Sequence, residues 1–134
     1  MKANELMIGD WVQVPCLTDN VEHYDAWYKV KQLRDCDLDV IGFKELKYNE
    51  IMPIPLTAKI LEKNGFGYKE EDGYMSHYYL GHRGYLANPD LHIGTYNKGV
   101  YWLNYYDNAI HGIKYVHKLQ HALRLCGINK EIKF

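Results

Sequence analysis

Residues 115–134 constrain the fold of this 134-residue chain more than any other segment. Apolar residues recur there at the 3.6-residue period of one helix face: Tyr115, Leu119, Ala122, Leu123 and Cys126. Gly127 follows the last of them, where a residue in the left-handed conformation commonly ends a helix. The segment therefore predicts a long carboxyl-terminal helix that docks its apolar face on the core.

The opposite face of this predicted helix is polar, with His117, Lys118, His121 and Arg124. His117 and His121 have the i, i+4 spacing by which one helix face can offer two imidazoles to a metal ion. A metalloprotease would carry Glu directly after the first histidine, but Lys118 stands there and would repel a cation. We therefore predict a solvated basic face. The two histidines are weak metal-ligand candidates, and we expect no metal or other cofactor.

Patterns typical of strands fill most of the first half of the chain. Alternating apolar and polar residues predict strands over residues 6–14, 25–33, 38–43 and 46–52, with a loop over 21–25. A Gly9-Asp10 turn signal leads into the first strand, as in small β-barrels of SH3-like type. Pro53 and Pro55 then interrupt the pattern. We therefore expect an SH3-like N-terminal β unit that ends at about residue 54.

The second half begins with a short helix. Thr57 is a suitable N-cap, and Asn64-Gly65 is a suitable end. Further strands are predicted over residues 66–70, 74–80, 92–96 and 100–106, with an Asp72-Gly73 hairpin signal between the first two. The connections are too short for parallel crossovers, so the strands are expected to be antiparallel.

The order of elements predicts the α+β class, because strands and helices are segregated along the chain. We expect a single domain over residues 1–134. Its sub-units are the SH3-like β unit, about 1–54, and a unit over 55–134 that holds the short helix, the antiparallel sheet and the long C-terminal helix. The predicted core is Trp11, Val12, Val14, Val30, Ile41, Ile60, Leu61, Phe66, Leu103, Val116, Leu119, Leu123 and Cys126.

Composition limits the classes of protein that remain. The chain is 47% hydrophobic and 25% charged, which is ordinary for a globular protein, and no apolar run approaches the ~20 residues of a membrane span. The first residues lack the apolar region of a secretory signal. Cys16, Cys36 and Cys126 are odd in number and form no Cys-x-x-Cys pair. We therefore expect a cytoplasmic protein with no membrane association and no disulfide framework.

Tyrosine is unusually frequent, with thirteen residues against three phenylalanines. In the second half, tyrosines combine with one tryptophan and two cations into a candidate binding surface: Tyr79, Arg83, Tyr85, Tyr96, Lys98, Tyr101, Trp102 and Tyr105. Aromatic and basic residues of this kind form protein interfaces, and they also stack the bases of single-stranded nucleic acids. The net charge of −1 provides no global attraction for nucleic acid, which favours a protein partner.

The sequence offers no persuasive catalytic pattern. It has neither a P-loop nor a dinucleotide-binding glycine motif. Cys126 falls on the predicted buried helix face, and Cys36 lies between Asp35 and Asp37, whose charges disfavour a thiolate. His82 and Arg83 stand between two glycines and could meet an anion, but a hairpin turn with polar tips is the favoured interpretation. We assign no catalytic residue and do not expect an enzyme.

Three short motifs carry a resemblance. They are Ile-Gly-Asp-Trp-Val at residues 8–12, Pro-Ile-Pro-Leu-Thr with a later Asn-Gly-Phe within residues 53–66, and Val-His-Lys-Leu-Gln at residues 116–120. Together they resemble a group of small proteins of anaerobic gut bacteria, their phages and other mobile elements, to which no activity is assigned. Met7 departs from the basic residue usual before the first motif, and residues 67–111 are divergent. The resemblance implies a small cytoplasmic accessory protein of prophage or mobile-element origin.

Taken together, the residues favour a non-enzymatic interaction or structural protein with an unidentified protein partner. Two alternatives stay open at this level: a nucleic-acid-binding accessory protein that uses the aromatic and basic sheet face, and a metal-binding or enzymatic protein.

Overall fold

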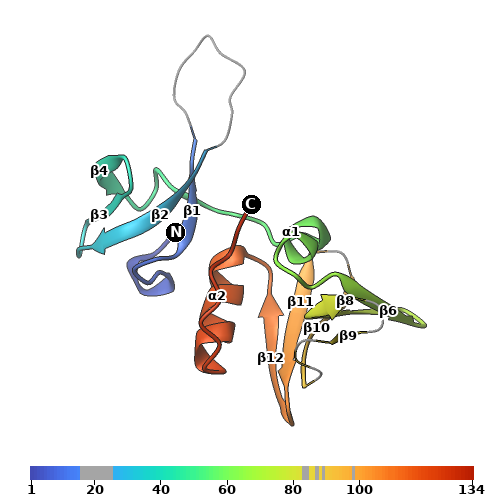
Figure 1. Ribbon diagram of the computed structural model, residues 1–134. Coiled ribbons are helices and arrows are strands. Elements are labelled where there is room, and N and C mark those ends of the chain that lie inside the picture. Colours follow the sequence, from blue (N-terminus) through green and yellow to red (C-terminus); the bar gives the residue numbers. More distant parts are fainter. Residues whose placement is uncertain (16–25, 83–84, 87, 89, 98) are drawn as a thin grey trace. The chain divides into compact units, whose positions relative to one another are not determined.

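The protein is an α+β structure of antiparallel sheets with two α-helices, as expected (Figure 1). The computed structural model describes residues 1–15, 26–82, 85–86, 88, 90–97 and 99–134. The chain divides into two compact units, Met1–Ile54 and Pro55–Phe134, each with its own sheet. No helix among the described residues is long and apolar enough to cross a membrane.

The N-terminal unit is a five-stranded antiparallel sheet in the order β4-β3-β2-β1-β5. A short 3-10 helix, η1 (Ala3–Glu5), precedes the strands. The strands are β1 (Trp11–Val14), β2 (Ala26–Leu33), β3 (Asp37–Val40), β4 (Phe43–Lys47) and β5 (Met52–Pro53).

The Gly9-Asp10 turn joins this sheet as the sequence predicts. Gly9 has a φ of +88°, a conformation that glycine adopts without steric cost. Its N–H donates to the carbonyl of Val30 at 2.8 Å, and the Val30 N–H donates to the carbonyl of Asp10, also at 2.8 Å. The buried Asp10 carboxylate accepts from the Met7 N–H at 2.7 Å. The turn therefore fixes the start of β1 against β2.

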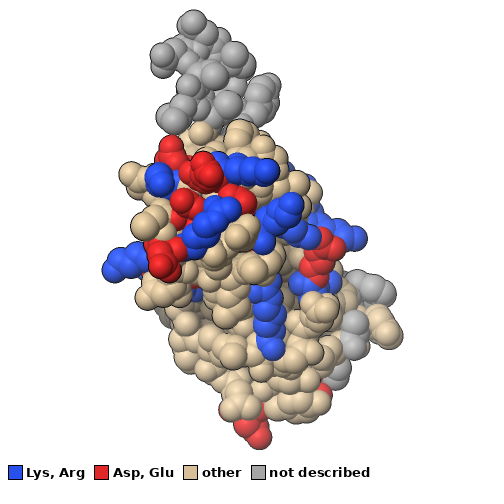
Figure 2. Space-filling model, turned by 90° about the vertical axis from the view of Figure 1, so that its left-hand side faces the viewer, with Lys and Arg blue, Asp and Glu red and all other residues tan. Residues whose placement is uncertain are grey.

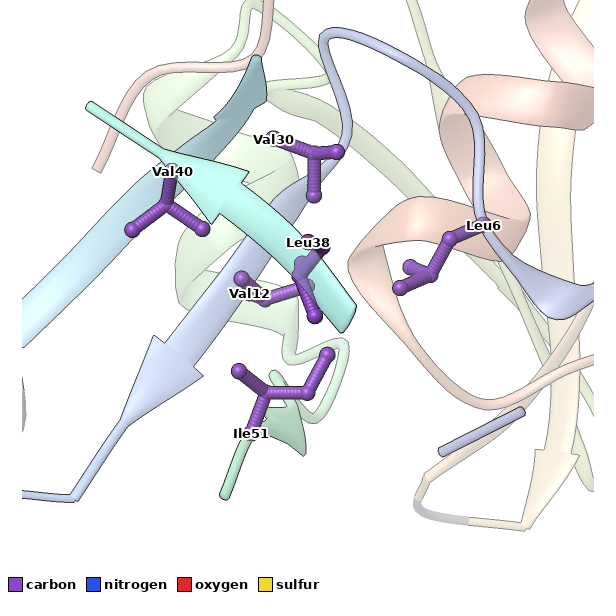
Figure 3. Close-up of a cluster of buried hydrophobic side chains, with 6 residues drawn as sticks. All are labelled: Leu6, Val12, Val30, Leu38, Val40 and Ile51. Carbon is purple, nitrogen blue, oxygen red and sulfur yellow. The ribbon is translucent and has the colours of Figure 1, made fainter. Parts of the chain in front are cut away.

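The core of this unit is a cluster of six buried aliphatic side chains (Figure 3). Val12, Val30, Leu38 and Val40 come from the three central strands, and Leu6 and Ile51 come from the segments at either end. The burial of Val12 and Val30 confirms two predicted core positions. Trp11 and Val14 are only half-buried.

The predicted strand over residues 38–43 is wrong in one respect, because a turn divides it. Ile41 and Gly42 connect β3 to β4, and Gly42 has a φ of +103°. Ile41 is consequently 61% exposed, so its predicted place in the core is wrong. The predicted strand over 46–52 is likewise interrupted, by a turn between β4 and β5. Cys16 and the predicted loop over 21–25 lie outside the described residues.

The C-terminal unit contains a second five-stranded antiparallel sheet in the order β12-β11-β10-β7-β6. Its strands are β6 (Tyr68–Asp72), β7 (Met75–Tyr79), β10 (Leu91–Asn97), β11 (Val100–Tyr105) and β12 (Asn108–Ile113). A two-stranded ribbon, β8 (Gly81–His82) and β9 (Tyr85–Leu86), lies between β7 and β10 in sequence. The helices are α1 (Ala58–Lys63) and α2 (Val116–Leu125).

The caps of both helices lie where the sequence predicts, and the two carboxyl-terminal ends share one glycine-based hydrogen-bond pattern. The Thr57 side chain accepts from the Ile60 N–H at 3.2 Å and caps α1. After each helix a glycine takes a positive φ, +86° at Gly65 and +72° at Gly127. Each helix is then closed by a Schellman pair of hydrogen bonds: Gly65 to Glu62 and Phe66 to Leu61 after α1, and Gly127 to Arg124 and Ile128 to Leu123 after α2.

Helix α2 buries more of its circumference than the sequence indicates. Leu119, Ala122 and Leu123 are buried as predicted, whereas Cys126 is only half-buried. His117 is 2% exposed, so its predicted place on a solvated face is wrong. Val116 is buried as predicted, and Gln120, a polar residue outside the predicted core, is buried as well. The buried side of α2 is therefore centred closer to residues 116 and 120 than the apolar residues alone suggest.

The carboxyl-terminal tail is tied to the end of α1. Asn64, itself buried, donates to the carbonyl of Lys133 and accepts from the Lys133 N–H, both at 2.7 Å. Its amide also donates to the carbonyl of Ile60 at 2.8 Å. The side chain of Ile132, the residue before Lys133, is buried. The tail therefore adds an apolar side chain to the core of the unit.

Candidate functional site

Strand register divides the residues of the C-terminal sheet between two faces. Tyr68, Tyr79, His92 and Asn104 are direct cross-strand neighbours from β6 to β11, and Glu70, His77, Gly94 and Trp102 form the next row. Direct neighbours point to the same side of a sheet. These two rows define what we call the aromatic face.

The first row is a line of rings in contact. The centroids of Tyr68 and Tyr79 are 5.7 Å apart, and those of Tyr79 and His92 are 5.2 Å apart. The amide nitrogen of Asn104 lies 3.0 Å from Nε2 of His92 and ends the row. His77 joins this row to the second, with its ring centroid 5.2 Å from that of His92.

Trp102 is the centre of the second row. Its indole lies directly over Gly94, because a Cβ built on that glycine would be 2.2 Å from Cζ2 of the indole. Tyr96 stacks on the indole with a centroid distance of 4.5 Å, and the rings of His77 and His111 lie 6.0 and 6.4 Å away. The missing side chain at Gly94 thus lets the tryptophan lie flat on the sheet and support the rings around it.

The charge on this face is acidic. Glu70 accepts from the Tyr68 hydroxyl at 2.8 Å, and burial together with the Glu70 charge raises the pKa of Tyr79. Burial and the proximity of His77 lower the pKa of His92, which favours its neutral form. Among the described residues that the register places on this face, none is Lys or Arg. The aromatic face is therefore suited to a neutral or cationic ligand.

The structure brings together only part of the predicted binding set. Tyr79, Tyr96 and Trp102 lie on the aromatic face. Tyr101 is 4% exposed and lies on the opposite face, where burial raises its pKa. Tyr105 is on that face too, close enough to Cys126 at the end of α2 to interact with it electrostatically. The prediction that Tyr101 and Tyr105 belong to the same surface as Trp102 is therefore wrong.

Of the three remaining members of the predicted set, the structure describes one. Tyr85 is on β9, outside the five-stranded sheet, and is 62% exposed. Arg83 and Lys98 lie outside the described residues.

The sequence-based set also lacks four rings of this face: Tyr68, His77, His92 and His111. Side chains alternate between the two sides of a strand. His77 and Tyr79 therefore share one side of β7, and His92 and Tyr96 share one side of β10. That signal was present in the sequence. Without the pairing between strands, however, it could not show that these rings touch.

The two histidines of α2, the weak metal-ligand candidates, lie next to each other on the helix. Their ring centroids are 5.8 Å apart, and the His117 ring stacks on Tyr115 at 5.8 Å. In the described part of the chain, no group of three or more His, Cys, Asp or Glu residues is placed to hold a metal ion.

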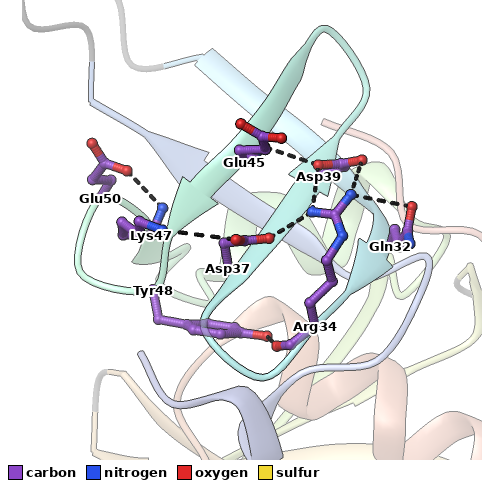
Figure 4. Close-up of polar contacts among 8 residues, drawn as sticks. All are labelled: Gln32, Arg34, Asp37, Asp39, Glu45, Lys47, Tyr48 and Glu50. Carbon is purple, nitrogen blue, oxygen red and sulfur yellow. Dashed lines mark hydrogen bonds and ion pairs between the residues drawn. The ribbon is translucent and has the colours of Figure 1, made fainter.

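A carboxylate cluster in the N-terminal unit is also structural in character (Figure 4). Arg34 holds Asp39 with two bonds of 2.9 and 3.0 Å and also contacts Asp37. Asp39 accepts from the Glu45 N–H at 2.9 Å, which steadies the positive φ of Glu45, +55°. The Arg34 bond and the Glu45 amide lower the pKa of Asp39. Because Asp39 is held ionised, it is unsuited to acid–base catalysis.

Comparisons with models of known protein families, with curated proteins and with solved structures found no match for this chain.

Proposed function

We propose that the protein is a binding module whose aromatic face holds a basic segment of a partner protein. This proposal rests mainly on the set of contacting rings around Trp102. Glu70 lies on the same face of the sheet, and none of the described residues of that face is Lys or Arg. Arginine and lysine side chains pack against aromatic rings through cation–π contacts, and a carboxylate at the edge adds a charge-assisted hydrogen bond.

The exposure of the rings supports this use. Trp102 is buried beneath its neighbours, whereas Tyr96, stacked on it, is 62% exposed. A rigid buried indole with an exposed tyrosine above it offers contact area at a low cost in side-chain entropy. The half-buried Tyr68, His77 and Tyr79 extend the surface along the sheet.

Charge argues against nucleic acid, the first alternative. Lys and Arg side chains that neutralise phosphates provide most of the affinity in complexes with nucleic acid. The described residues of the aromatic face include the carboxylate of Glu70 and no Lys or Arg. On the face of the molecule shown in Figure 2, Lys and Arg are interspersed with Asp and Glu rather than gathered into one positive field. A protein partner therefore fits the described surface better.

Fluorescence of Trp102 tests the proposal directly. In a Trp11→Phe, Trp27→Phe background Trp102 is the remaining tryptophan. We expect a peptide of alternating arginine and glycine to change its emission with saturation, and a glutamate–glycine peptide to have no effect. Tyr96→Ala should weaken the binding roughly three- to tenfold, the range expected for one lost cation–π contact.

Tyr85→Ala is the matched control, because Tyr85 is as exposed as Tyr96 (62% each) but lies outside the sheet. It should leave the affinity unchanged. Tighter binding of oligothymidylate than of the arginine peptide would favour the nucleic-acid alternative. Binding of neither probe would reject the aromatic face as a site for cationic ligands.

Four finer expectations accompany this proposal. The SH3-like character of the N-terminal unit, the cytoplasmic location, the absence of enzymatic activity and the prophage or mobile-element origin stay predictions from the sequence. They agree with a small accessory binding protein, and the proposed peptide contact depends on none of them.

A further inference from the structure

The N-terminal unit has a cavity of about 600 Å³ between the Gly9 turn, β2 and the β3–β4 hairpin. Three large apolar side chains at this cavity are exposed: Ile8 (64%), Ile41 (61%) and Phe43 (44%). Phe43 is held by an edge-to-face contact with Tyr28, with centroids 5.1 Å apart. We call this feature the N-terminal cavity. Its walls can accept a bulky apolar or aromatic side chain.

The border of the N-terminal cavity is positively charged. Lys29, Lys31 and Lys44 line it, against the single carboxylate of Asp39. That carboxylate is already occupied by Arg34 and by the Glu45 amide. The cavity therefore suits a ligand that combines an apolar anchor with negative charge.

The C-terminal unit carries such a segment at the tip of its β6–β7 hairpin. Register pairs Asp72 with Met75, so Gly73 and Tyr74 form the loop. Tyr74 is 95% exposed, the highest exposure among the large hydrophobic residues of the described chain. Glu70, Glu71 and Asp72 precede it, and Lys69 pairs with Glu71 at 2.8 Å. The tip therefore has an excess of negative charge next to an unburied aromatic ring.

We propose that the β6–β7 hairpin tip of one molecule docks in the N-terminal cavity of a second copy. Tyr74 enters between Ile8, Ile41 and Phe43, and the carboxylates of Glu71 and Asp72 meet the lysines at the border. The two surfaces differ, so the contact is heterologous, and every copy carries one of each. This self-association is independent of the aromatic face.

Sedimentation velocity of the full chain over a range of concentrations tests the proposal. At low ionic strength we expect the mean mass to rise with concentration, and at ~1 M salt we expect the association to weaken, because surface charge pairs are screened. Tyr74→Ser, and separately the pair Lys31→Glu, Lys44→Glu, should each weaken association on the order of tenfold or more.

Reversing the charges of the hairpin tip and of the cavity in two separate variants shows whether association depends on the proposed contact or on a general change in solubility. Glu71→Lys, Asp72→Lys gives a basic tip, and Lys31→Glu, Lys44→Glu gives an acidic cavity. Each variant alone should stay monomeric, whereas an equimolar mixture should associate, because both contacts in the mixed complex are complementary. Circular dichroism confirms that each variant is folded.

Lys2→Glu and Tyr85→Ser are the controls, since both side chains are exposed and neither lines the cavity or the tip. Both should associate like the unaltered chain. Tyr96→Ala should too, which distinguishes this proposal from the peptide-binding one. A monomer at every concentration in low salt, or association that survives Tyr74→Ser, would overturn the proposal.

Discussion

A single glycine determines the shape of the aromatic face. Gly94 is paired with Trp102 across β10 and β11, and the indole occupies the space that a side chain would need. Gly94 does not have a positive φ, so its importance is steric rather than conformational. Glycine in a strand often marks such a close approach.

Gly94→Ala should therefore displace the indole. The new Cβ would stand 2.2 Å from Cζ2, so the ring must rotate away from the sheet and break its contact with Tyr96. We expect a loss of ~1–3 kcal/mol in the free energy of unfolding by urea, together with a changed near-ultraviolet circular dichroism spectrum. Gly67→Ala is the control, because its Cβ would come no closer than 3.4 Å to a neighbour. An unaltered aromatic spectrum in Gly94→Ala would contradict this account of the face.

His92 makes the stability depend on pH. Burial, and then the nearby His77, lower its pKa in the folded state, while Glu70 acts weakly in the opposite direction. Below the unfolded value of about 6.5 the unfolded chain therefore binds more protons than the folded one, and stability falls as the pH decreases toward the folded pKa. Above about pH 6.5 this contribution to stability is fully present.

Replacing this histidine tests the sign of that effect. His92→Gln should reduce the loss of stability between about pH 7 and pH 5, measured as the urea midpoint at each pH. His111→Gln provides the comparison, because His111 is exposed at the same face. If His92→Gln and the unaltered chain lose stability in parallel, the half-buried imidazole of His92 is not the source of the acid sensitivity.

At the scale of elements, local signals were sufficient for the helices but not for every strand. Thr57 starts α1, and Gly65 and Gly127 end α1 and α2, as predicted, because caps depend on neighbours within a few residues. β12 was not predicted, since it is short of apolar residues and forms an edge beside β11. The turn at Ile41-Gly42 was also missed, because isoleucine there favours a continuous strand.

Leu119 tests the docking of α2. Its side chain is fully buried on the helix, so Leu119→Ala should lower the free energy of unfolding by about 2–5 kcal/mol through lost burial and an unfilled cavity. Leu125→Ala on the same helix is the control: Leu125 is 79% exposed, and its loss should change the thermal midpoint little. An unchanged midpoint for Leu119→Ala would refute a docked helix.

For the whole molecule, the important arrangement is two compact units, each built on an antiparallel sheet. The proposed partner segment binds to the aromatic face of one unit, and the proposed self-association joins the cavity of one unit to the hairpin tip of the other unit in a second copy. These two activities rely on different residues. Failure of either experiment would therefore leave the other proposal standing.

About half of the candidate site could be predicted from the sequence. The sequence placed Tyr79, Tyr96 and Trp102 in one candidate surface, and in the structure their rings lie on one side of the C-terminal sheet. Tyr101 and Tyr105 were also included in the candidate set, and the structure places both on the opposite face of the sheet. His77 and His92 were absent from the candidate set, since nothing in the sequence shows that they lie beside these rings.

The sequence by itself determined the class of the fold, the ends of both helices and most strands, because capping, turns and alternation are interactions between residues close in the chain. Only the tertiary structure decided which rings share a face, that Trp102 lies over Gly94, and that His117 is buried. Those properties depend on the register between strands and on the packing of α2. A shift of one residue in pairing reverses every side chain, so periodicity along a strand cannot identify the partners across it.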